Sequence, residues 1–344
     1  MKLYRIMQFE RGGLKQCEEA DPGPPVGRQV LVRLHASSLN FKDRFLYGGG
    51  DYAKNITGLG GIPLCEGAGV VHAVGPDVTR AAVGDRVAVA VHWDWIGGEI
   101  PDSFNIFGRG PRGNDGMLTQ MTLLDESELV HLPDSLSFEE AATLPCAGLT
   151  AWSALHHGVP LLPGETVLVQ GTGGVSVFAL QFAKLSGARV IATTTSRSKM
   201  DTLNQLGADV VVDISGGPGW CKDVLAATEG RGVDVVIDVI GTSFWGDTIP
   251  ATRENGRMSL VGSMDGWGEG TGGGSMQSLF MRGLQIYPTR VGSREHFVQM
   301  VRAIGAHKLH PVIDRIFDFD DAAGAFDYNI FGGGRIGKIV IRHD

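Results

Sequence analysis

The chain has 344 residues, of which 43% are hydrophobic and 20% charged, and its formal net charge is −8. This composition is typical of a globular protein of about two domains, and an acidic chain without a basic block argues against nucleic acid as a partner. No apolar stretch approaches the roughly 20 residues of a membrane span, and the N-terminus shows no signal-peptide pattern. Four scattered cysteines without a C-x-x-C pair favour a reduced, cytoplasmic protein.

The first 130 residues predict a β-rich region. Strand-like runs occur at residues 29–36, 69–74 and 85–91, with turn signals between them. Residues 93–116 form a long irregular segment whose aromatic side chains either line an apolar pocket or simply pack: Trp93, Trp95 and Phe107. Residues 134–155 then show a helical pattern that opens on a capping box, Ser137 to Glu140.

From residue 165 the pattern changes to alternating strands and helices. Strands are predicted at residues 166–170, 189–194, 210–213, 233–238, 258–262 and 284–288, which indicates a doubly wound parallel sheet. After a predicted helix at 294–307, residues 337–342 return to β character. We therefore predict an α/β protein in which a β-rich domain of residues 1–132 and 292–344 encloses a nucleotide-binding domain of residues 133–291.

A glycine-rich turn joins the first strand of this second region to a helical pattern at 175–185. Gly171 allows a tight turn, and Gly173 and Gly174 let backbone N–H groups approach a pyrophosphate at the helix N-terminus. Ser176 stands where a third glycine is expected. A purely structural turn is the alternative, but the placement between strand and helix favours dinucleotide binding.

Several segments together resemble the medium-chain dehydrogenase/reductase superfamily over essentially the whole chain. They are LNFKD at 39–43, PLCEGAGVV at 63–71, VGDRV at 83–87, AATLPCAGLTAW at 141–152, the glycine turn, and GKIVIR at 337–342. The branch that contains quinone oxidoreductases and zinc-alcohol-dehydrogenase-like reductases is the most similar. The resemblance implies a GroES-like catalytic domain, a Rossmann domain, hydride transfer with a nicotinamide cofactor in a cleft between them, and a homodimer paired through the last Rossmann strand, near 284–288.

In zinc members of this superfamily, the catalytic metal is held at positions that correspond to Asn40, Cys65 and Cys146. The four cysteines of the structural zinc site are missing from the region 91–117. Because an amide is a poor zinc ligand beside thiolates, we expect no zinc, with two-thiolate zinc binding as the alternative.

The predicted cofactor is NADP(H). NAD-preferring Rossmann proteins carry an acidic residue at the end of the second strand, where this chain has Thr194. Arg197 and Lys199 follow and can pair with a 2′-phosphate, unless both are simply solvated. The motifs and the resemblance together imply these cofactor-binding residues: Gly171, Thr172, Gly173, Gly174, Val175, Thr194, Ser196, Arg197, Lys199, Ile240, Gly241, Val261, Gly262 and Lys338.

The candidate catalytic residues are Asn40, Lys42, Asp43, Tyr52 and Thr150. Asn40 can donate to a carbonyl oxygen or ribose hydroxyl, or it is only a turn residue. Lys42 either supplies positive charge to an oxyanion or is an ordinary charged residue on the surface. By resemblance, Asp43 orients the loop, Tyr52 lines the substrate cleft and can donate a proton, and Thr150 flanks the nicotinamide, unless its hydroxyl bonds back to its own helix.

These residues favour a zinc-independent NADPH-dependent reductase of an activated carbonyl compound, such as an α,β-unsaturated ketone or aldehyde, or a quinone. One alternative is an alcohol dehydrogenase or ketone reductase of the same fold, with or without zinc. A second alternative is a non-catalytic NADPH-binding protein.

Overall fold

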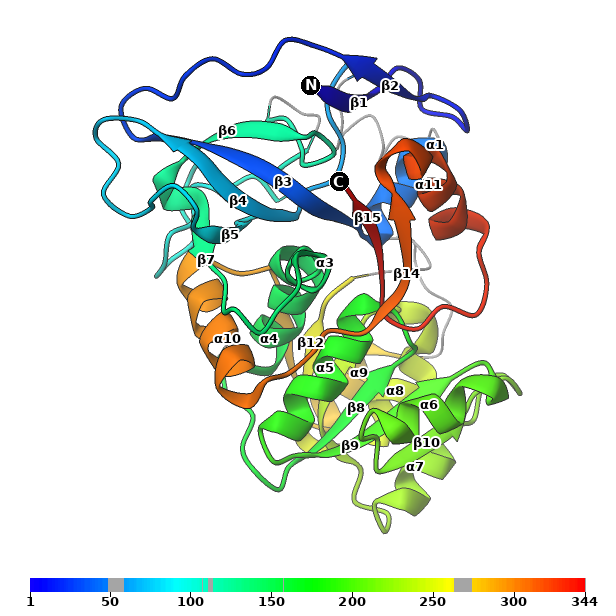
Figure 1. The fold of residues 1–344 in the computed structure, drawn as a ribbon. Helices are drawn as coiled ribbons and strands as arrows, with labels where there is room; N and C mark the ends of the chain where they lie inside the picture. Colours follow the sequence, from blue (N-terminus) through cyan, green and yellow to red (C-terminus); the bar gives the residue numbers. More distant parts are fainter. Residues whose placement is uncertain (49–58, 107, 111–113, 157, 263–273, 344) are drawn as a thin grey trace. The chain divides into compact units, whose positions relative to one another are not determined.

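The computed structural model describes residues 1–48, 59–106, 108–110, 114–156, 158–262 and 274–343 (Figure 1). They divide into two compact units. The first unit comprises Met1–Leu149, Val291–Gly333 and Lys338–Asp344, and the second comprises Thr150–Arg290 and Gly334–Gly337. This division differs from the expected boundaries in three places. Residues 133–149 and Val291 lie with the β-rich unit, and residues 334–337 lie with the nucleotide-binding unit.

The first unit is built on a seven-stranded sheet with the order β14-β15-β3-β4-β5-β7, in which β6 also pairs with β3; β1 and β2 form a separate hairpin. The bounds are β1 Lys2–Ile6, β2 Leu14–Glu18, β3 Gln29–Leu39, β4 Gly67–Val74, β5 Arg86–Val89, β6 Met121–Asp125, β7 Leu129–His131, β14 Ile313–Asp318 and β15 Lys338–Arg342. The expected strands at 29–36, 69–74 and 85–91 correspond to β3, β4 and β5. Strand β15 lies beside β3, so the last residues of the chain complete a sheet that begins near the N-terminus.

The helices of the first unit are α1 Phe45–Gly48, α3 Phe138–Ala141, α10 Arg294–His307 and α11 Ala322–Phe331. The capping box at the start of α3 is confirmed, because Ser137 Oγ accepts from the Glu140 N–H at 3.1 Å and Glu140 Oε2 accepts from the Ser137 N–H at 2.8 Å. The helical pattern expected at 134–155 is not one helix. It divides into α3, a π-helical turn at Leu144–Gly148 and α4 at Leu149–His156, since Pro145 has no N–H to continue the ladder.

The second unit is a six-stranded parallel sheet with the order β10-β9-β8-β11-β12-β13, flanked by helices (Figure 1). The strands are β8 Thr166–Gln170, β9 Arg189–Thr194, β10 Val210–Asp213, β11 Val233–Asp238, β12 Thr252–Leu260 and β13 Gln285–Pro288; the helices are α5 Gly174–Leu185, α6 Met200–Gln205, α7 Cys221–Ala227, α8 Trp245–Ala251 and α9 Met276–Met281. All six expected strands are present, although β12 begins well before the expected residue 258. When the strands β8 to β13 are renumbered 1 to 6 in chain order, their order across the sheet is 3-2-1-4-5-6. This is the Rossmann topology, so the expected α/β fold is confirmed.

Buried apolar side chains explain why these strands form. All residues of β8 and β11 are buried, as expected for central strands of a parallel sheet covered on both faces. None of the helices in the described part of the chain is long and apolar enough to cross a membrane.

Candidate functional site

The turn between β8 and α5 leaves open space at its glycines. Gly171 has φ +75°, a backbone conformation that favours glycine. Gly173 has φ −72° and caps α5, and no protein atom lies within 4 Å of where a Cβ would stand. Neither backbone geometry nor packing requires glycine at position 173. The missing side chain instead lets a ligand approach the N-terminus of the 12-residue helix, where the helix dipole favours an anion.

Ser176 completes the contact between helix and strand where a third glycine was expected. Its side chain is 3% exposed, and its Oγ donates to the Gln170 carbonyl oxygen at 2.7 Å. The hydroxyl is therefore satisfied inside the protein, and the helix still packs closely on β8.

The end of β9 carries the residues expected to select the cofactor. Thr194 is buried, and its Oγ1 accepts from the Ser196 N–H at 3.1 Å. Arg197 Nε donates to Asp213 Oδ2 at 2.7 Å, and this contact lowers the pKa of Asp213 to about 2. Asp213 ends β10 directly beside Thr194 in the sheet, and sequence reasoning did not identify it.

Lys199 joins the same region to the glycine turn. Its Nζ donates to Thr172 Oγ1 and to the Arg335 carbonyl oxygen, both at 2.9 Å. The Gly337 N–H also donates to the Thr172 carbonyl oxygen at 3.0 Å. The segment Gly334–Gly337 is thus fixed against the glycine turn within the second unit.

Two further expected cofactor segments follow β11 and β12. The Ile240 and Gly241 N–H groups donate to Asp238 Oδ1 at 3.1 and 2.9 Å, which fixes the turn after β11. Val261 and Gly262 follow β12, and the Val261 N–H donates to the Asp238 carbonyl oxygen at 2.8 Å. Both segments lie at the carboxyl edge of the sheet, the edge where open α/β sheets bind ligands.

In the first unit, Asn40 lies between the end of β3 and the start of the short 3-10 helix Phe41–Arg44. Its backbone N–H donates to Asp43 Oδ2 at 2.7 Å, so Asp43 fixes the start of this turn. Burial raises the pKa of Asp43 to about 6, although nearby Lys42 opposes the shift.

Glu66 is the centre of a buried hydrogen-bond cluster. Its carboxylate accepts from Ser38 Oγ at 2.5 Å, Asn40 Nδ2 at 2.6 Å, Lys338 Nζ at 2.7 Å and the Cys146 N–H at 2.7 Å. Glu66 is 0% exposed and Lys338 is 3% exposed. Lys338, which the resemblance assigned to the cofactor, therefore has its ammonium beside Asn40 and Glu66. Glu66 follows Cys65 as it does in zinc members of the superfamily that the chain resembles, but the site residues expected from the sequence did not include it.

Two thiols and an ammonium lie next to Asn40. Cys65 and Cys146 are hydrogen-bonded to each other, and Lys42 is hydrogen-bonded to Cys65. The bond from Cys146 and the charge of Lys42 hold the pKa of Cys65 below its usual value, whereas the same bond and burial raise the pKa of Cys146. Burial of the ammonium lowers the pKa of Lys42, but the nearby Cys65, Cys146 and Asp43 side chains together outweigh burial and raise the pKa.

The donor set at this cluster does not fit a catalytic zinc ion. Such an ion needs three protein ligands and one open position. Here the atom of Asn40 that faces Cys65 is the amide nitrogen, a hydrogen-bond donor, with 3.8 Å between Nδ2 and Sγ. The Lys42 ammonium already provides a positive charge beside the thiols, where a zinc ion would lie. In the described ranges, no three His, Cys, Asp or Glu side chains are grouped so that they could hold a metal ion.

The other expected residues fall in different places. Thr150 is buried in α4, and Tyr52 and Phe107 lie outside the described residues. Trp95 is 3% exposed and packs edge-on against Phe104, with ring centroids 5.7 Å apart.

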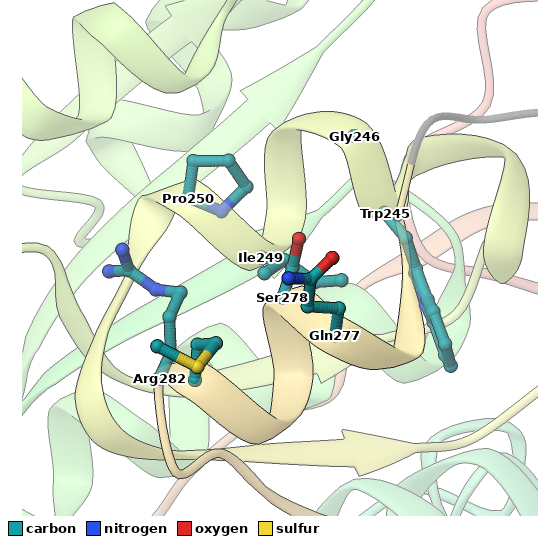
Figure 2. Close-up of a pocket in the computed structure, with 9 residues that line it drawn as sticks. Trp245, Gly246, Ile249, Pro250, Gln277, Ser278 and Arg282 are labelled. Carbon is teal, nitrogen blue, oxygen red and sulfur yellow. The ribbon is translucent and has the colours of Figure 1, made fainter.

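A cavity of about 350 Å³ lies between α8 and α9 in the second unit (Figure 2). Its lining residues are Trp245, Gly246, Ile249, Pro250, Gly274, Gln277, Ser278, Met281 and Arg282. None of the expected site residues lines it, so this cavity is separate from both groups described above.

Comparison with known proteins yields matches along the chain. Residues 27–134 match the family model of the alcohol dehydrogenase GroES-like domain, and residues 174–306 match that of zinc-binding dehydrogenases. A zinc-type alcohol dehydrogenase-like protein of Schizosaccharomyces pombe is 36% identical over 100% of both chains. Among solved structures, an NAD-dependent alcohol dehydrogenase is 30% identical with a TM-score of 0.88 over 100% of both chains. A quinone oxidoreductase from Pseudomonas syringae pv. Tomato DC3000 is 27% identical with a TM-score of 0.78 over 99% of both chains.

Proposed function

Because the chain belongs to the medium-chain dehydrogenase/reductase superfamily of oxidoreductases, we propose that it is a zinc-independent NADPH-dependent reductase of activated carbonyl compounds. The substrate class is an α,β-unsaturated ketone or aldehyde, or a quinone. The observation that carries this proposal is the cluster around Cys65, in which the Asn40 amide nitrogen faces the thiol and the Lys42 ammonium lies beside both thiols. Such donors polarise a carbonyl oxygen without a metal ion.

Within this proposal the second unit holds the cofactor. The N-terminus of α5 binds the pyrophosphate, and Gly173 leaves room for it. When bound, the reduced nicotinamide supplies a hydride to the electrophilic carbon of the substrate. Asn40 then donates a hydrogen bond to the substrate oxygen as negative charge develops there, and Lys42 adds positive charge. Thr150 and Tyr52 remain the proposed contacts to the nicotinamide ring and the proton source.

The preference for NADPH rests on charge near the end of β9. Thr194 provides no carboxylate to repel a 2′-phosphate, and Arg197 and Lys199 provide two cations. Asp213 has the opposite effect and favours NADH, because its carboxylate already pairs with the Arg197 guanidinium that would bind the 2′-phosphate of NADPH. We propose that the phosphate outcompetes this carboxylate, since the Arg197 side chain is 87% exposed and its ion pair is weak.

The experiment that tests this function is cofactor oxidation with a panel of enones, quinones, aldehydes and ketones, using NADPH and NADH, with and without chelator. We expect NADPH-dependent reduction of an enone or a quinone that chelator leaves unchanged. Chelator-sensitive alcohol oxidation supports the zinc-dependent alcohol dehydrogenase alternative. Tight NADPH binding without turnover of any compound supports the non-catalytic alternative.

We also propose that the protein is a homodimer paired through β13. This strand is the last in the six-stranded sheet, so one of its edges has no strand partner among the residues that the structure describes. The preceding helix α9 exposes Met276, Phe280 and Met281 at 80%, 81% and 71%. Sedimentation of the protein and of the Phe280→Glu variant tests this; a wild-type monomer contradicts the proposal.

A further inference from the structure

We propose that Glu66 and Lys338 are positioning residues that hold the Asn40 amide in one orientation, with its nitrogen directed as a donor toward the substrate oxygen. The inference rests on the proposed function, in which Asn40 contacts that oxygen. It gives Lys338 a different task from the cofactor contact that the superfamily resemblance implied.

The two partners of the amide differ in kind, and this difference determines its orientation. Lys338 Nζ lies 2.7 Å from Asn40 Oδ1, and an ammonium can only donate. Glu66 Oε1 lies 2.6 Å from Asn40 Nδ2, and a carboxylate can only accept. Rotating the amide by 180° would place its NH₂ group against the ammonium and its oxygen against the carboxylate. Both new contacts are repulsive, so the observed orientation is strongly preferred.

The backbone of Asn40 is fixed as well. Its N–H donates to Asp43 Oδ2 at 2.7 Å, and its carbonyl oxygen accepts from Asn329 Nδ2 at 3.1 Å. Lys338 Nζ donates a further bond to the Leu39 carbonyl oxygen at 2.6 Å. Asn40 is therefore held at the main chain and at both side-chain atoms, which is the preorganisation that an electrostatic catalyst requires.

One N–H of the Asn40 amide is used on Glu66, and the second faces a more distant acceptor. The sulfur of Cys65 lies 3.8 Å from Nδ2, whereas Glu66 Oε1 lies 2.6 Å from it. A substrate carbonyl oxygen that approaches more closely can replace the contact to sulfur. Glu66 and Lys338, which together we call the clamp, thus leave the amide with one donor hydrogen that is available for the reaction.

Burial makes the clamp sensitive to removal of either charge. Lys338 is 3% exposed and Glu66 0% exposed, so water cannot easily take the place of a missing partner. Removal of the ammonium frees Asn40 Oδ1 and makes the flipped amide accessible.

The kinetic test compares Lys338→Met, Lys338→Arg and Glu66→Gln with wild type. We expect Lys338→Met to lower kcat about 10-fold to 100-fold with an unchanged Kd for NADPH, and Lys338→Arg to restore part of the loss. In the Asn40→Ala background, Lys338→Met should have little further effect, because both changes remove the same interaction. A full additional loss in that background contradicts the proposal, as does a weaker Kd for NADPH with unchanged kcat.

A matched control separates positioning from general destabilisation. Arg257 and Glu165 form a partly buried ion pair in the second unit, with 2.6 Å between Nη2 and Oε2 and side chains 9% and 14% exposed. Arg257→Met should lower the melting temperature as Lys338→Met does, but it should leave kcat unchanged. Equal loss of kcat in both variants would assign Lys338 a merely structural role.

A second measurement does not depend on catalysis. In protein labelled with ¹⁵N-asparagine, the Asn40 side-chain NH₂ pair is assigned by its loss in Asn40→Asp. The proposal predicts two resolved side-chain protons in wild type, of which the one bonded to Glu66 exchanges slowly, and faster exchange of that proton in Lys338→Met. Rapid exchange in wild type contradicts the clamp even if the enzyme reduces enones, whereas slow exchange in a protein without turnover supports the clamp and contradicts only the proposed reaction.

Discussion

The guanidinium of Arg197 is ion-paired with Asp213, with 2.7 Å between Nε and Oδ2, beside the ends of β9 and β10. Arg197 is 87% exposed, so the pair adds little to the stability of the fold. In the proposed function, the Asp213 carboxylate and the 2′-phosphate of NADPH compete for this one guanidinium.

Arg197→Glu should shift the cofactor preference toward NADH. The reversed charge would repel a 2′-phosphate, so we expect the KM for NADPH to rise at least about 10-fold while the KM for NADH changes little. The surface variant Arg302→Glu in α10 makes the same charge change elsewhere and should affect neither constant. Equal kinetic efficiency of the wild-type protein with both cofactors would contradict the predicted specificity.

Gly173→Ala should weaken cofactor binding without unfolding the protein. The added methyl group meets no protein atom within 4 Å, and the backbone conformation suits alanine. It would occupy the space proposed for the pyrophosphate, so we expect the Kd for NADPH to rise about 10-fold or more. Gly216→Ala is the matched control, because a Cβ there also meets nothing within 4 Å. If both variants bind NADPH like wild type, the pyrophosphate does not lie at this turn.

Asn40→Asp should remove the proposed donor at nearly constant volume. We expect kcat to fall about 100-fold, which is typical of losing one oxyanion-stabilising donor, with NADPH binding retained. Asn204→Asp, at an exposed position in α6, should leave steady-state kinetics unchanged. An Asn40→Asp enzyme with wild-type kcat would show that the amide takes no part in the reaction.

Zinc content provides an independent check of the cluster around Cys65. Because the Lys42 ammonium already lies beside the thiols, protein purified without chelator should contain well below one zinc per chain. Elemental analysis measures this directly. One tightly held zinc ion per chain would support the zinc-dependent alternative and contradict the proposed mechanism.

His156 should make the fold less stable in mild acid. Burial lowers the pKa of His156 from 6.5 to about 4, so the native state keeps it neutral while the unfolded chain takes up a proton. Its contribution to stability is complete above pH 6.5 and is lost as the pH falls from there toward 4. We expect the free energy of unfolding to fall by at most about 2 kcal/mol from this group between pH 7.5 and pH 5.

Urea unfolding of wild type and His156→Gln at both pH values measures this effect. The exposed His307→Gln variant is the control and should retain the wild-type pH dependence. An unchanged pH dependence in His156→Gln would show that another group is responsible.

The sequence by itself determined the Rossmann unit, because its signals are local. The glycine turn and the six strands of the parallel sheet were predicted from short patterns, as was the capping box at Ser137 in the first unit, and the structure shows each of them. Asn40 was a candidate donor because its amide can donate to a carbonyl oxygen and because it lies in the superfamily motif at 39–43.

Only the tertiary structure decided what surrounds those residues. Lys338 and Glu66 are 272 positions apart, and their contact exists because β15 pairs with β3 and brings the end of the chain to Asn40. Asp213 reaches Arg197 through the pairing of β10 with β9. Local patterns report which backbone conformation a segment prefers, whereas the partner of a buried charge depends on which distant strand is its neighbour, and this is determined only when the whole sheet forms.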